Sequence, residues 1–143
     1  MTNEIYMLIH KPMWTKAKIR GKMVQVEDLR KMMLPGAVRY DKDRVQSSPE
    51  DPMIQYAIRL TELEEEIKKL QKRYLEEQQI LIKSIEKLKD PNEQYVLIAR
   101  YVKGIKVEDV AEEMHVSDST AYRWHRVGLA HLNETIGDDK HGG

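Results

Sequence analysis

The chain has 143 residues, of which 34% are charged and only 6% are aromatic, with no Phe. So few large apolar side chains exclude a thick globular core, and a hydrophobic fraction of 41% excludes a disordered chain. Because there is no Cys, disulfides and thiolate metal sites are also excluded. We therefore expect an all-α protein whose long helices bury narrow apolar stripes.

The 24 basic and 24 acidic residues cancel over the whole chain, but they are unevenly distributed. Residues 1–50 carry ten Lys/Arg and six Asp/Glu, whereas residues 91–143 carry six and nine. Any binding of nucleic acid must therefore depend on local charge. No apolar run approaches the ~20 residues that cross a bilayer, and residues 1–14 lack the features of a signal peptide. These observations predict a cytoplasmic protein with no membrane partner.

A first helix is predicted from about Met13 to Met33, because apolar residues recur there every three or four positions. Pro35 and Gly36 are expected to end it, since Pro interrupts the hydrogen-bond ladder and Gly accepts a left-handed cap. Residues 36–50, which include the mixed-charge segment 39–46, are predicted to form a loop. This helix and loop form the predicted N-terminal segment, residues 1–50.

A long, coiled-coil-like helix is predicted in the next segment, residues 51–90. Asp51 is expected to cap it and Pro52 to occupy its first position. Its apolar stripe shifts register at Gln78, as in a stutter. The stripe consists of Met53, Tyr56, Leu60, Leu63, Ile67, Leu70, Tyr74, Leu81, Ile85 and Leu88. Such a stripe needs a partner, and two remain open: the first helix folded back as an antiparallel hairpin, and a second chain in a homo-oligomer.

A domain boundary is predicted at Asp90, which is followed by Pro91 at a first helical position. Glu93, three residues after the cap, completes the pattern of a capping box. The domain that follows, residues 91–136, is expected to hold three short helices. Residues 137–143 are expected to be a disordered tail.

Within residues 91–136 the pattern indicates a helix-turn-helix. Gly104 is expected to end the first helix, and residues 115–117 to form the turn, with Ser117 or Asp118 capping the third helix. The small Ala111 suits a close helix crossing, and Val116 is expected to fill the turn.

The third helix carries the residues that we expect to contact double-stranded DNA. Arg123 and Arg126, with Lys103 and Lys106, are predicted to hold the phosphate backbone. The remaining members of the predicted site, Ser119, Thr120 and Tyr122, are expected to help recognise bases. Trp124 and His125 are expected to pack in the core rather than touch DNA, as is Tyr101.

No catalytic function is predicted from this sequence. The five His residues show no metal-ligand spacing, and no nucleophile–base pair, phosphate loop or dinucleotide fingerprint occurs. We therefore expect neither metal nor cofactor, and we do not expect an enzyme.

The stretch from Leu97 to Leu132, LIARYVKGIKVEDVAEEMHVSDSTAYRWHRVGLAHL, resembles the C-terminal helix-turn-helix of sigma factors, called region 4. It is closer still to phage and prophage proteins that include the ArpU-like and RinA-like late-transcription regulators. Those proteins also resemble it in the coiled-coil helix before the motif and in a segment like VRYDKDRVQS at residues 38–47. The resemblance covers roughly residues 36–135, and its RYV and YRWHR elements are the most telling. It implies a regulator that acts on phage or prophage promoters, with residues 119–126 facing DNA and RNA polymerase as a partner.

The sequence departs from that pattern at two positions. His115 occupies a turn position that such motifs usually give to Gly, and a positive φ there is expected to cost about 1 kcal/mol. Lys106 replaces the Ser or Thr that commonly caps the second helix.

Two other functions remain open at this point. A DNA-packaging component such as a small terminase subunit also pairs a helix-turn-helix with an oligomerising coil, and it predicts a ring of eight or more chains. A structural helical adaptor predicts no salt-dependent affinity for DNA.

Overall fold

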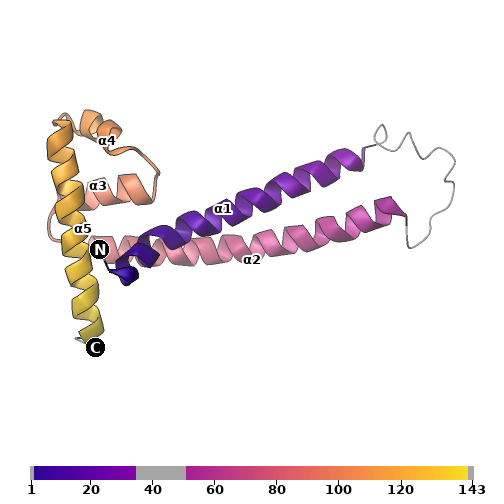
Figure 1. Ribbon diagram of the computed structural model, residues 1–143, viewed down its shortest axis with the longest axis horizontal. Coiled ribbons are helices and arrows are strands. Elements are labelled where there is room, and N and C mark those ends of the chain that lie inside the picture. The colour runs from indigo at the N-terminus through magenta and orange to yellow at the C-terminus, as the bar shows by residue number, and fades with distance from the viewer. Residues whose placement is uncertain (1, 35–50, 142–143) are drawn as a thin grey trace. The chain divides into compact units, whose positions relative to one another are not determined.

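The computed structural model describes residues 2–34 and 51–141, and all of its regular elements are helices (Figure 1). They are α1 (Asn3–Met32), α2 (Pro52–Glu86), α3 (Pro91–Tyr101), α4 (Val107–Met114) and α5 (Asp118–His141). No strand occurs among the described residues, which confirms the predicted all-α class. The predicted helix end at Pro35-Gly36 and the loop at residues 36–50 lie outside the described residues.

None of these helices combines the length and the apolar character that a bilayer span requires, over the residues that the structure describes. The chain divides into two compact units. The first unit consists of Trp14–Tyr74, and the second unit combines Met1–Met13 with Leu75–Gly143.

The first unit is an antiparallel hairpin of α1 and α2. Lys22 Nζ lies 2.8 Å from Glu66 Oε2, and Arg30 Nη2 lies 3.1 Å from Glu64 Oε1, so later residues of α1 meet earlier residues of α2. The side chains that it buries are Thr15, Ile19, Leu63 and Ile67. Part of the partner for the predicted stripe is therefore the first helix of the same chain.

The start of α1 differs from the prediction, because the helix begins at Asn3 rather than near Met13. Pro12 lies inside it and is buried. An interior Pro costs roughly 3 kcal/mol. The burial of Ile5 and Ile9, which are at most 1% exposed, contributes about 1.5–3 kcal/mol for each side chain and offsets that cost.

One apolar cluster joins four of the helices in the second unit. Its buried members come from four helices and the turn after α2: Ile5, Ile9, Leu81, Ile85, Leu88, Leu97 and Leu132. The start of α1 and the end of α2 thus belong to the core of the unit that contains the predicted helix-turn-helix.

The boundaries of α3 and α5 test the sequence predictions further. Asp90 Oδ1 accepts a hydrogen bond from the Asn92 N–H at 2.8 Å, and Pro91 occupies the first position of α3, as predicted. At the other end, α5 continues to His141. Residues 137–141, expected to be disordered, are helical.

Candidate nucleic-acid interface

The helices α3, α4 and α5 contact one another pairwise and form the predicted helix-turn-helix. One cluster of buried residues joins Val96 and Ala99 of α3 to Val110 of α4, and Trp124 of α5 packs against it. Ala111 of α4 is 1% exposed beside Ala121 of α5, which is fully buried. The small side chains allow the close crossing that the sequence predicted.

The turn between α4 and α5 is a Schellman motif centred on His115. The Val116 N–H donates to the Ala111 carbonyl at 3.0 Å, and the His115 N–H donates to the Glu112 carbonyl at 3.2 Å. His115 adopts φ 59° and ψ 43°, so the predicted positive φ is confirmed. Val116 packs against Ala111 and Ala121, as predicted, and thereby fixes the angle at which α5 leaves the turn.

Ser117 caps α5. Its Oγ accepts a hydrogen bond from the Thr120 N–H at 3.2 Å and lies 2.8 Å from Thr120 Oγ1 and 3.1 Å from Ser119 Oγ. These contacts fix the hydroxyl groups of Ser119 and Thr120 at the first turn of the helix. By contrast, Lys106 precedes α4 without a side-chain cap, as predicted.

Four of the predicted site residues share one exposed face of α5. All four are exposed, and each lies three or four positions from another member of the set, a spacing that places side chains on the same side of a helix: Ser119, Tyr122, Arg123 and Arg126. Thr120 is half-buried, so its hydroxyl is less available to a ligand.

The two predicted lysines lie in the connection from α3 to α4. Lys103 and Lys106 are both exposed there. Lys106 and the α5 face affect the same carboxyl group, because the hydrogen bond from Tyr122 and the charge of Lys106 both lower the pKa of Glu108. Among the described contacts, none joins Lys103 to the side chains of α5.

Glu108 and Arg100 are parts of this site that the sequence analysis missed. The Tyr122 hydroxyl donates to Glu108 Oε1 across the α4–α5 contact. That hydrogen bond holds the pKa of Glu108 below its ordinary value and raises the pKa of Tyr122. Arg100 lies over the Tyr101 ring, 5.6 Å from its centroid, and its positive charge adds to the lowering of the Glu108 pKa but opposes the rise of the Tyr122 pKa.

A weak signal for Arg100 existed in the sequence. It is the first letter of the RYV element, and it stands in the last turn of α3 just before the connection that carries Lys103 and Lys106. No comparable signal marked Glu108, because an acid in the first turn of a helix is ordinary.

Trp124 and His125 face the interior, as predicted. Trp124 is half-buried against Val96, Ala99 and Val110. His125 Nε2 lies 2.7 Å from the Tyr101 hydroxyl, and burial lowers the pKa of His125, with a smaller contribution from Arg100. The Tyr101–His125 contact ties the end of α3 to the middle of α5.

The fold and the site together define an all-helical protein with a helix-turn-helix motif and a helical hairpin. The chain belongs to the family described as "Protein of unknown function (DUF1492)", whose model matches residues 37–133. No curated protein and no solved structure matches the chain.

Proposed function

We propose that the chain is a sequence-specific DNA-binding transcriptional regulator of the phage or prophage type, similar to the ArpU-like and RinA-like regulators. The observation that carries the proposal is the exposed face of α5. It presents the guanidinium groups of Arg123 and Arg126 beside Ser119 and Tyr122, while the opposite side of the helix is anchored in the core. An α-helix fits the major groove of B-DNA, where such side chains meet base edges and phosphates.

In this mechanism α5 lies in the major groove. Arg123 and Arg126 bind phosphate oxygens or guanine edges, and Ser119 contributes a hydroxyl at the helix N-terminus, where backbone N–H groups favour phosphate. Glu108 holds the Tyr122 hydroxyl in one orientation, which reduces the conformational freedom that Tyr122 loses on binding. RNA polymerase is the second partner, and the cytoplasm is the location that both partners require.

The test is fluorescence anisotropy on duplexes tiled across the DNA that flanks the gene, run over a series of salt concentrations. The wild-type chain is compared with the Arg123→Ala/Arg126→Ala variant. We expect one tile to be preferred, and we expect the variant to lose about tenfold or more of its affinity for that tile, since one bidentate base contact is worth ~1–3 kcal/mol.

The Lys83→Ala/Lys89→Ala variant is the matched control. It also removes two positive charges, from exposed residues at the end of α2 and just after it. It should keep the preference for the same tile. If no tile is preferred, or if both variants behave alike, the proposed recognition face is wrong and a protein partner for the helix-turn-helix is favoured.

A further inference from the structure

The hairpin unit carries a concentration of positive charge that the proposed recognition face does not use. In α1, residues 14–26 contain four Lys/Arg and no Asp/Glu, and in α2, residues 67–75 also contain four and none. We call these eight residues the basic belt: Lys16, Lys18, Arg20, Lys22, Lys68, Lys69, Lys72 and Arg73. All except the half-buried Lys22 are exposed.

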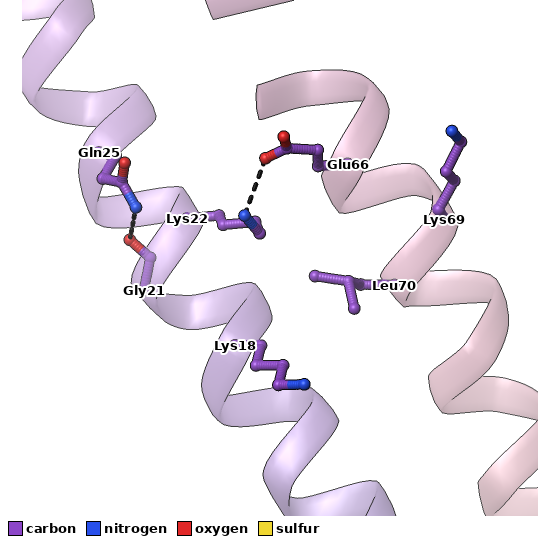
Figure 2. A pocket seen from close by; sticks show the side chains of 7 residues that line it. All are labelled: Lys18, Gly21, Lys22, Gln25, Glu66, Lys69 and Leu70. Atoms are coloured by element: carbon purple, nitrogen blue, oxygen red, sulfur yellow. Dashed lines mark hydrogen bonds and ion pairs between the residues drawn. The ribbon is translucent and has the colours of Figure 1, made fainter. Parts of the chain in front are cut away.

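Three residues of the belt, Lys18, Lys22 and Lys69, line a groove between the two helices. Gly21 of α1 and Glu66 and Leu70 of α2 also line it. In Figure 2 Lys22 reaches from α1 toward Glu66 and Leu70 points toward α1, whereas Lys69 projects from α2 on the side away from α1. A Cβ added at Gly21 would meet no atom within 4 Å, so the α1 wall is open at this position. Leu70 lines the groove with an apolar side chain, along which the lysine stems can lie.

The acid that lines this groove, Glu66, is paired with basic side chains. Glu66 lies 2.8 Å from Lys22 Nζ and 3.8 Å from Arg59 Nη1. The hydrogen bond from Lys22 holds the pKa of Glu66 below its ordinary value, and the charges of Lys22, Arg59 and Lys69 act in the same direction. Within the described part of the chain, Lys18 and Lys69 form no ion pair, so their charges remain available to a ligand.

The partner that fits this surface is a polyanion with closely spaced charges. Duplex DNA carries one phosphate charge per ~1.7 Å of its axis. The segment that holds the helix-turn-helix, residues 91–143, has six basic and nine acidic residues, so its net charge of −3 repels DNA. A DNA-binding chain of this kind needs attraction from elsewhere, and the belt places eight basic residues in two short stretches that contain no acidic residue.

We propose that the basic belt of the α1–α2 hairpin is a second DNA-binding surface that contacts the phosphate backbone without regard to sequence. This rests on the proposed function in one respect, namely that the partner is DNA. The belt supplies affinity and a high association rate, whereas the α5 face supplies the choice of sequence.

The experiment compares the full-length wild-type chain with Lys18→Gln/Lys69→Gln on two duplexes, the preferred tile and a scrambled duplex of equal length. We expect the variant to bind both duplexes more weakly by the same factor. We also expect the slope of log affinity against log salt to become shallower by about 1.8, or ~0.9 for each lost phosphate contact. Circular dichroism checks that the helices are retained, as exposed helical Lys→Gln changes predict.

Two further variants separate this proposal from the proposed function. Lys83→Gln/Lys89→Gln removes the same charge outside the belt and should leave the slope unchanged. Arg123→Ala/Arg126→Ala should abolish the preference between the duplexes, whereas Lys18→Gln/Lys69→Gln should keep it. If Lys18→Gln/Lys69→Gln matches the wild type on both duplexes, the proposal is overturned and an acidic protein becomes the partner of the belt, whatever the arginine variant does.

Discussion

Two histidines on α5 have pKa values shifted in opposite directions. His131 Nδ1 lies 2.6 Å from Glu93 Oε1, and this hydrogen bond, with the negative charge of Glu93, raises the pKa of His131 above 6.5. Glu93 is only 5% exposed, so protonated His131 provides a charged partner for a buried carboxyl group. His125 is shielded from water and its pKa is lowered, so it favours the neutral form.

We predict that His131→Gln lowers stability in acid more than in base. A raised folded-state pKa contributes stability that is fully present below the unfolded-state value of 6.5 and is lost as pH rises through the folded-state value. Urea unfolding of wild type and variant at about pH 5.5 and about pH 8.5 measures this difference. Taking the difference between the two proteins cancels the opposite contribution of His125, and an equal difference at both pH values would contradict the assignment.

The turn positions show what sequence can establish at the scale of single residues. The sequence predicted the positive φ of His115, the packing of Val116 and the cap at Ser117, because backbone geometry and capping depend on neighbours in the chain. Glu93 was predicted as part of a capping box, but its carboxylate contacts His131, 38 positions further along the chain. Long-range partners such as this one, or Glu108 for Tyr122, leave no local signal.

At the scale of elements, α5 depends on a close approach to α3. A Cβ at Gly128 would lie 3.3 Å from Glu93 Cβ and 3.4 Å from Leu97 Cδ1. The absence of a side chain at this position therefore sets how closely the two helices pack. Gly137 lies later in the same helix, where an added Cβ meets no atom within 4 Å.

We predict that Gly128→Leu destabilises the chain by roughly 1–3 kcal/mol, because an overpacked contact must push α3 and α5 apart. Gly137→Leu is the matched control, since both changes gain about the same helix propensity, ~1 kcal/mol, and only the first creates a clash. The measurement is the midpoint of thermal unfolding. Equal midpoints for the two variants would show that α3 and α5 do not constrain each other at this position.

The ends of α1 and α5 show where prediction from sequence failed at the element scale. The apolar period from Ile19 to Met33 located the middle of α1, but Pro12 separates it from Ile5 and Ile9, and an interior Pro normally marks an end. The GDDKHGG segment after Ile136 has the composition of a tail, yet residues 137–141 continue the helix. In both segments the local sequence favoured the end of the helix. The burial of Ile5 and Ile9 explains why α1 nevertheless begins before Pro12.

At the scale of the molecule, the domain boundary predicted at Asp90 does not coincide with the boundary of the packed core. The break between α2 and α3 is real, but Ile5 and Ile9 pack with Leu81, Ile85 and Leu132 in one cluster. Periodicity identifies which face of a helix is apolar, and it does not identify the helix against which that face packs. The unit that contains the helix-turn-helix is thus completed by residues that lie far from that motif in sequence.

We predict that Ile9→Ala destabilises the helix-turn-helix, although it lies far from that motif in the chain. Removing a fully buried Ile side chain costs about 2–5 kcal/mol. Because Ile9 and Leu132 share one cluster, the loss should appear in α5 as well as in α1. Native-state hydrogen exchange measures this directly, as reduced protection of the slowest amides of α5.

The matched control for this change is Met7→Ala in the same helix. Met7 is 41% exposed, so its truncation should alter stability by no more than ~0.5 kcal/mol. If Ile9→Ala lowers protection in α1 alone, α5 is stable without the N-terminal turns, and a chain that lacks residues 1–13 should keep the protection of α5. If both helices lose protection together, the start of α1 is a structural part of the unit that contains the helix-turn-helix, and that shortened chain should lose the protection of α5.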